Sequence, residues 1–198
     1  MSSKGGSFER EVCKELSTWL NHGANDEGLW RTSSSGGRST VRRKDGRRAD
    51  AHAGDIVATT AEGVALLRHV CFELKTGYGR WSVQDDIDRT QPGKSKFAKF
   101  VEQAVRQCPS GKLPVLITRR LGGHAMMWTP ERMHCTPLED APTIRVCLST
   151  EGEWFGMTLS TFKTRITPER FMFLAMHSSS AIALPQAKAN PLKRTRGV

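Results

Sequence analysis

The sequence lacks any apolar run that approaches the roughly 18 residues needed to span a bilayer. Residues 1–6 lead straight into a charged segment and lack the apolar core of a secretory signal. The five cysteines are an odd number and include no CxxC pair, which argues against a disulfide framework and against a zinc finger. From these absences we expect a cytoplasmic protein with no membrane segment.

The composition is ordinary for a globular protein, because 37% of the 198 residues are hydrophobic and 25% are charged. This length suits a single domain with a sizeable core. We expect that domain to cover residues 1–182. Residues 183–198 form a polar, basic tail without apolar periodicity, and we expect them to be disordered.

Positive charge dominates the chain, with a formal net charge of +10 and a sequence pI of about 9.8. Such an excess favours a polyanionic partner, with nucleic acid first. Much of the charge lies in residues 31–48, which lack apolar periodicity and are expected to form a mobile loop. This loop is either a solvated surface segment or a phosphate-binding arm, and its density of arginine favours the arm. Its cations are Arg31, Arg38, Arg42, Arg43, Lys44, Arg47 and Arg48.

The order of apolar patterns indicates an α/β protein. Three- and four-residue spacing predicts an amphipathic helix over residues 7–22. Strands are expected over 55–60 and 70–76 with a turn at 61–63 between them. The later elements are expected to be a helix at 97–108, strands at 113–118 and 125–129, further strand within 144–159, and helix at 159–166 or 171–176.

The strand at 70–76 carries the first chemical pattern. Side chains alternate between the two faces of a strand, so Glu73 and Lys75 share one face and Phe72 and Leu74 share the other. The apolar face would anchor the strand on the core. The polar face would present a carboxylate beside an ammonium group.

Asp55 opens the preceding predicted strand directly after Gly54. If the two strands form an antiparallel hairpin, Asp55 faces Glu73 when the turn is centred near Val64, beside Gly63. A tighter turn or a bulge would shift this register, so the sequence leaves the pairing open. Asp50 is a rival for Asp55, although it adjoins the basic loop and does not lie at the start of a strand.

Two carboxylates held a few ångströms apart repel each other unless a cation lies between them. Carboxylate oxygens suit Mg²⁺, with Mn²⁺ as a substitute. A lysine beside such a site can offset the negative charge that develops on a phosphate. Asp55, Glu73 and Lys75 together therefore favour metal-assisted phosphodiester hydrolysis. The alternative is that the acid-any-Lys triplet is an exposed strand face with alternating charges.

This order of motifs resembles the PD-(D/E)XK nuclease superfamily, and within it the archaeal-type Holliday junction resolvases and similar phage-encoded nucleases. The segments that carry the likeness are residues 4–11, 31–36, 54–56 and 72–75. The likeness covers roughly residues 4–120. The resemblance implies a central mixed β-sheet flanked by helices, and it makes the expected domain over 1–182 a nuclease domain.

The resemblance also implies roles for individual residues. Asp55 and Glu73 would bind the metal, with the carbonyl group of Leu74 as a further ligand. Lys75 would be the catalytic lysine. Glu9, on the first helix, matches an acidic residue that completes the metal site and assists catalysis in these resolvases.

The serine-rich segment matches a loop that lies near the scissile phosphate in the resolvases. Ser33, Ser34 and Ser35 are therefore expected to contact nucleic acid together with the cations of the basic loop, and the sequence does not rank them. In related nucleases a glutamine on the helix after the catalytic strand approaches the site. Gln103 and Gln107 are the candidates here.

The leading functional hypothesis is a Mg²⁺-dependent endonuclease that hydrolyses branched DNA. The resemblance to resolvases implies a homodimer. A sequence-specific or general nuclease of the same superfamily, acting on duplex DNA, would share the site. A nucleic-acid-binding protein without catalysis is the alternative of another class, supported by the basic loop and tail alone.

Overall fold

The computed structural model describes residues 4–32, 54–79, 81–87, 95–130, 143–148 and 151–179. The predicted basic loop therefore lies outside the described residues apart from Arg31 and Thr32. The predicted basic tail at 183–198 and the rival acid Asp50 also lie outside them.

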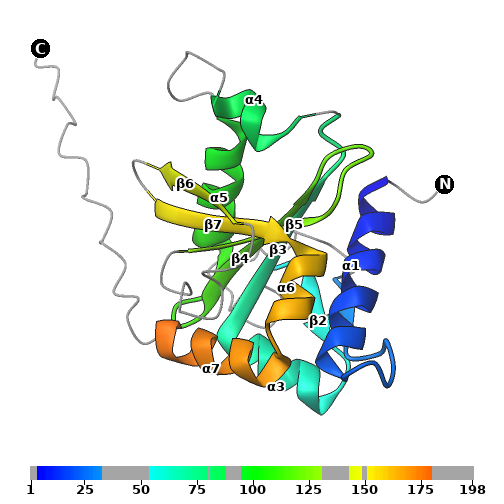
Figure 1. Cartoon of the computed structure of the whole chain (residues 1–198). Helices are drawn as coiled ribbons and strands as arrows, with labels where there is room; N and C mark the ends of the chain where they lie inside the picture. Colours follow the sequence, from blue (N-terminus) through cyan, green and yellow to red (C-terminus); the bar gives the residue numbers. More distant parts are fainter. Residues whose placement is uncertain are drawn as a thin grey trace, which may run out of the picture.

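A mixed five-stranded sheet forms the centre of the protein, in the order β3-β4-β5-β7-β6 (Figure 1). Strands β3 and β4 are parallel and the other pairs are antiparallel. The strands are β3 (Val70–Thr76), β4 (Leu113–Arg119), β5 (Met126–Pro130), β6 (Ile144–Leu148) and β7 (Gly152–Thr158). The mixed sheet confirms the predicted α/β class and agrees with a restriction-endonuclease-like fold.

Two short strands, β1 (Leu29–Arg31) and β2 (Ile56–Ala58), form a second, antiparallel sheet. Helices flank the central sheet on both sides (Figure 1). The helices are α1 (Lys4–Leu20), α3 (Ala61–His69), α4 (Val83–Ile87), α5 (Lys96–Gln107), α6 (Leu159–Arg165) and α7 (Pro168–Ser179). The helices predicted near 7–22 and 97–108 are thus confirmed, as are the strands after residue 113.

The central sheet separates two apolar layers, as the alternation of side chains along a strand requires. On β4, Val115 and Ile117 pack into the layer that contains α1, α3, α6 and α7, whereas Leu116 packs into the layer beneath α5. β4 lies between neighbours on both sides and has helices over both faces, which explains its continuous apolar sequence.

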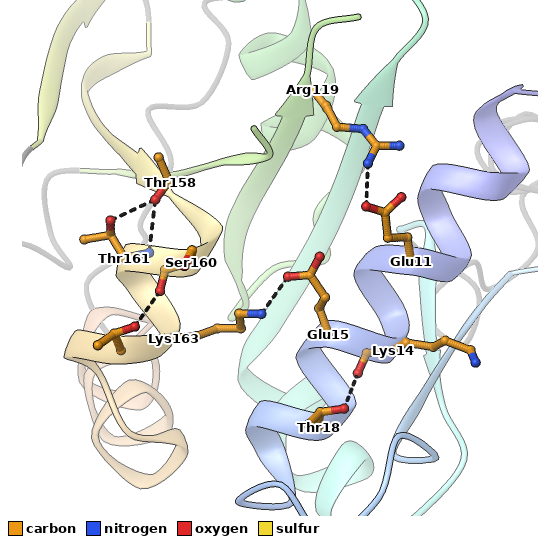
Figure 2. Close-up of polar contacts among 10 residues, drawn as sticks. Glu11, Lys14, Glu15, Thr18, Arg119, Thr158, Ser160, Thr161 and Lys163 are labelled. Atoms are coloured by element: carbon orange, nitrogen blue, oxygen red, sulfur yellow. Dashed lines mark hydrogen bonds and ion pairs between the residues drawn. The ribbon is translucent and has the colours of Figure 1, made fainter. Parts of the chain in front are cut away.

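Helix α1 packs into the apolar layer that it shares with α3, α6 and α7. Its apolar side is buried, and at its end the Trp19 indole Nε1 donates to the carbonyl oxygen of Ile166 at 2.8 Å. On its polar side, Glu11 and Arg119 are 2.6 Å apart, and so are Glu15 and Lys163 (Figure 2). The Arg119 guanidinium also lies over the ring of Phe8, 4.4 Å from its centroid. These contacts fix the helix that carries Glu9 against β4 and α6.

The predicted hairpin of residues 55–76 is wrong. The segment between the two strands is the nine-residue helix α3, β2 pairs with β1, and β3 pairs with β4 in parallel. The helix begins after Thr60, whose side chain accepts a hydrogen bond from the Gly63 N–H, and it has Arg68 and His69 in its last turn. Such a cap, with basic residues at the carboxyl end, stabilises a helix. Gly63 is therefore a helical residue and not the centre of a turn.

The parallel pair β3–β4 is joined through α4 and α5. A parallel connection needs a crossover of this kind. Helix α5 begins after Ser95, whose hydroxyl accepts from the Ala98 N–H. Its buried side, which includes Phe97, Phe100 and Val101, faces the sheet. The crossover consequently places one side of α5 next to the polar face of β3.

Among the residues that the structure describes, no helix is long and apolar enough to cross a membrane.

The layer beneath α5 yields a test of the packing. A Cβ added to Gly156 on β7 would lie 2.3 Å from the ring of Trp128, which is almost fully buried. We expect Gly156→Ala to lower the free energy of unfolding by ~1–3 kcal/mol, because overpacking forces the ring or the strand to move. Thermal unfolding followed by circular dichroism measures this change.

The control is Gly5→Ala in α1, where the nearest atom to an added Cβ is 4.0 Å away. This substitution should be neutral or stabilising, since alanine favours a helix more than glycine does. Equal melting temperatures for Gly156→Ala and the unaltered protein would contradict the tight packing of Gly156 on Trp128.

Candidate active site

The polar face of β3 presents two charged groups beneath α5. Glu73 Oε1 accepts a hydrogen bond from Lys75 Nζ at 2.6 Å and another from Gln103 Nε2 of α5 at 2.7 Å. Phe72 and Leu74 are buried in the opposite apolar layer. The predicted alternation of faces along β3 is therefore confirmed. Of the two candidate glutamines, the structure brings Gln103 to the carboxylate.

Asp55 is held against β3 by hydrogen bonds and not by the predicted hairpin. Its backbone N–H donates to the carbonyl oxygen of Phe72 at 2.9 Å, and its own carbonyl oxygen accepts from the Thr32 N–H at 3.0 Å. Its carboxylate Oδ2 accepts from the Leu74 N–H at 2.8 Å. Asp55 thus lies between the small sheet and β3, without belonging to a hairpin.

Gly54 makes this close approach possible. Its φ angle is +84°, and a Cβ added there would lie 2.8 Å from the carbonyl oxygen of Phe72 and 3.0 Å from Cys71 Sγ. Glycine adopts such a conformation readily, whereas other residues are strained in it. The position before Asp55 therefore requires glycine, because β3 leaves no space for a side chain there.

These groups line one cavity with a volume of about 190 Å³. Helix α1 contributes Glu9, which is 3.3 Å from the Arg31 guanidinium of β1. The structure thereby brings together the predicted residues Glu9, Asp55, Glu73 and Lys75, together with Leu74. The other residues that line the cavity are Gly5, Phe8, Thr76, Tyr78 and Gln103.

Burial and mutual repulsion disturb the acids of the cavity. Asp55 and Glu73 are each 3% exposed. Burial and the neighbouring Glu73 charge raise the pKa of Asp55 to about 7, against a smaller opposing effect of the Leu74 N–H and Lys75. Burial, Glu9 and Asp55 likewise raise the pKa of the Cys13 thiol to about 12. Carboxylate charge is therefore in excess where α1 meets β3.

The donor set fits a hard divalent cation. Asp55 and Glu73 contribute carboxylate oxygens to the same cavity. Burial, together with the Glu73 charge, outweighs the effect of Lys75 on the pKa of Asp55. Within the described ranges, no group of three or more His, Cys, Asp or Glu side chains forms a ready-made metal cluster. Glu9 lies on the wall of the cavity, against Arg31.

The remaining predicted contacts with nucleic acid divide into two groups. Arg31 is described and lies beside the cavity through its contact with Glu9. The others lie outside the described residues: Ser33, Ser34, Ser35, Arg38, Arg42, Arg43, Lys44, Arg47 and Arg48. Thr76 and Tyr78, which follow the triplet Glu73-Leu74-Lys75 and line the cavity, were missed in the sequence analysis. In the sequence, the run Gly77-Tyr78-Gly79 indicates only the end of a strand.

The raised pKa of Asp55 predicts an unusual dependence of stability on pH. In the folded protein Asp55 holds its proton up to about pH 7, whereas the unfolded chain loses it near 3.8. The folded state therefore binds more protons in this window, and the contribution of Asp55 to stability falls as the pH rises through it. In the absence of metal, Asp55→Asn should remove this loss and still accept the Leu74 N–H.

We compare the change in the free energy of unfolding that Asp55→Asn causes at pH 8 with the change that it causes at pH 5. We expect the change at pH 8 to be more stabilising by ~1 kcal/mol or more. This corresponds to roughly 2–4 °C in melting temperature. Thermal unfolding of both proteins in EDTA at the two pH values measures the difference. An effect of the substitution that is the same at pH 5 and pH 8 would show that Asp55 is not destabilised by its charge.

Comparison with known proteins agrees with this geometry. A family model with the description "Phage putative PDDEXK endonuclease" matches residues 1–172. No curated protein and no solved structure matches the chain. The family match spans the helix with Glu9, the small sheet with Asp55 directly before β2, and the strand with Glu73 and Lys75. The chain therefore belongs to this endonuclease family and is a PD-(D/E)XK nuclease.

Proposed function

We propose that the protein is a Mg²⁺-dependent endonuclease that hydrolyses DNA, with branched DNA as its preferred substrate. The observation that carries the proposal is the buried pair Asp55 and Glu73, which share a cavity with the Lys75 ammonium group. A pair of buried acids destabilises the fold unless a cation offsets its charge. The family supports a divalent metal and a nucleic-acid substrate.

Asp55 and Glu73 would hold the metal, with the carbonyl group of Leu74 as a further ligand and Glu9 completing the site. When bound, Mg²⁺ supplies Lewis-acid stabilisation of the charge that develops on the phosphate. Mn²⁺ is the expected substitute, because it prefers the same oxygen ligands. The Leu74 N–H orients the Asp55 carboxylate, and Gln103 orients that of Glu73.

Lys75 acts directly on the substrate in this proposal. Its side chain is 14% exposed and lies 2.6 Å from Glu73, so the ammonium group is held at the cavity and still open to it. It orients the attacking water and offsets negative charge on the phosphate. It also balances part of the Glu73 charge before the metal binds.

DNA binding rests on charge and on the resemblance to junction resolvases. The net charge of +10 favours a polyanion, and Arg31 carries positive charge to the side of the cavity. The basic loop would extend this contact, and the tail would add nonspecific affinity. A homodimer would present two such sites to the two strands that a resolvase cuts.

Two other functions make different predictions. A sequence-specific or general nuclease would cut a long duplex, into discrete bands or into a smear. A non-catalytic binder would yield no product with any divalent ion. The shared cavity of Asp55, Glu73 and Lys75 favours catalysis over binding alone, because clustered carboxylates facing a phosphate weaken binding.

Metal dependence is tested by Glu73→Ala. We expect this variant to lose DNA cleavage by at least about 100-fold and to lose Mn²⁺ binding, because one of two buried metal ligands is removed. Gel assays on a four-way junction, a linear duplex and single-stranded DNA measure cleavage, with Mg²⁺ or with EDTA. Isothermal calorimetry measures Mn²⁺ binding.

The matched control is Glu11→Gln, which alters an acid of α1 that pairs with Arg119 outside the cavity. It should cut DNA like the unaltered protein. Cleavage that survives EDTA, or full activity of Glu73→Ala, would exclude the metal mechanism. Equal cutting of all three DNAs would overturn the preference for branched DNA and leave a general nuclease.

Lys75→Met separates catalysis from metal binding. The substitution removes the ammonium group from Glu73, so Mn²⁺ should bind as well as before or more tightly. The turnover number should nevertheless fall by about 100-fold or more, because the charge that stabilises the reacting phosphate is lost. Loss of Mn²⁺ binding together with activity would instead assign Lys75 a purely structural role.

A further inference from the structure

One exposed aromatic side chain that lines the cavity has no role in the mechanism above. Tyr78 lines the cavity with Asp55 and Glu73, yet it is 43% exposed. The flanking residues Gly77 and Gly79 have φ angles of +88° and +67°. Two left-handed positions turn the chain sharply immediately after β3, and this turn presents the ring to solvent.

The ring of Tyr78 is braced from behind. It packs on Phe100 of α5 with ring centroids 4.7 Å apart and an interplanar angle of 49°. Phe100 is 7% exposed and meets Trp81 edge-on at 5.3 Å. A ring held in this way loses little further freedom when it binds a ligand, which favours recognition of a flat partner.

A second apolar side chain comes from the turn between β4 and β5. The Leu121 N–H donates to the carbonyl oxygen of Gly79 at 3.0 Å, which ties this turn to the Tyr78 segment. Leu121 is 70% exposed. Tyr78 and Leu121 thus belong to two tethered turns, one of which borders the cavity. We call these two residues the rim pair.

We propose that the rim pair is a binding subsite for a nucleobase next to the scissile phosphate, with the base stacked on Tyr78 and Leu121 acting as an apolar wedge. This inference rests on the proposed nuclease function. A nucleotide whose phosphate enters the cavity of Asp55, Glu73 and Lys75 brings its base to the border of that cavity. A flat, uncharged base is the part of the substrate that matches a braced aromatic ring.

The subsite would give the nuclease a preference among DNA structures. In an intact duplex a base must first leave its stack before it can lie on Tyr78, which opposes binding. A base at a junction, a flap or a gap is already partly or fully unstacked. Apolar side chains inserted between base steps act in the same direction, because they favour DNA that bends or opens easily. The rim pair therefore selects substrates with an unpaired nucleotide beside the cut.

Photo-crosslinking tests the contact without requiring cleavage. The probe is a flapped duplex that carries 5-iodouracil at an unpaired position next to the cleavage site, bound to the protein in a Glu73→Gln background. Irradiation should give an adduct that peptide mass spectrometry maps to residue 78. Tyr78→Phe should keep the adduct, and Tyr78→Ala should lose it.

Cleavage in the active protein tests the consequence. Tyr78→Ala should lower kcat/KM on the flapped substrate about 5- to 100-fold, the range expected for one stacked base, with a much smaller loss on an intact duplex. Leu121→Ser should act in the same direction, and Tyr78→Phe should retain activity. The control is Phe173→Ala, which removes an aromatic ring of similar exposure. Phe173 belongs to α7, which lies beside α3 and far from the carboxyl end of β3 (Figure 1).

The outcomes separate the two proposals. If the unaltered protein cuts no DNA, the nuclease proposal fails whatever the crosslink shows. If it cuts DNA but Tyr78→Ala matches it on every substrate, or if the adduct lies elsewhere, the nucleobase subsite is overturned and the nuclease stands. An equal loss on flapped and intact DNA also overturns the subsite. Circular dichroism melts that match the unaltered protein verify that each variant is folded.

Discussion

The hydrogen bond from the Leu74 N–H to the Asp55 carboxylate joins the small sheet to the strand that carries Glu73 and Lys75. A second bond, from the Asp55 N–H to the carbonyl oxygen of Phe72, fixes the backbone at the same place. Together these bonds hold Asp55 next to β3, although Asp55 is distant in sequence from Glu73 and Lys75. The proposed site depends on this junction, because β2 and β3 are separated by a nine-residue helix and share no ladder.

The same junction creates an electrostatic constraint. It buries Asp55 close enough to Glu73 for burial and the like charge to raise the pKa of Asp55 to about 7. One ammonium group, that of Lys75, opposes this effect only in part. A protein gains nothing in stability from such a pair. We therefore regard the excess of buried carboxylate as the physical basis for a bound cation, and the rim pair beside it as the part that selects the DNA.

The sequence predicted the local features of the site and missed their assembly. Alternation along β3 placed Glu73 and Lys75 on one face, because a strand has a fixed period of two. The hairpin failed because Ala61-Glu62-Gly63 looks like a turn, whereas Thr60 caps a helix there. The position of Asp55 depends on the pairing of β2 with β1 and on the bond from the Thr32 N–H. These contacts join segments that are distant in sequence, so local patterns do not reveal them. Tyr78 was overlooked because only the assembled cavity shows that the turn after β3 borders the site.

The most direct test of the central claim is a crystal structure of the full chain grown with Mn²⁺ and measured at a wavelength where manganese scatters anomalously. We predict an anomalous peak between the carboxylates of Asp55 and Glu73, at about 2.0–2.3 Å from their oxygens, as expected for oxygen ligands of such a cation. The absence of a peak in this cavity at millimolar Mn²⁺, or binding of Mn²⁺ only at other acids of the chain, would contradict the account.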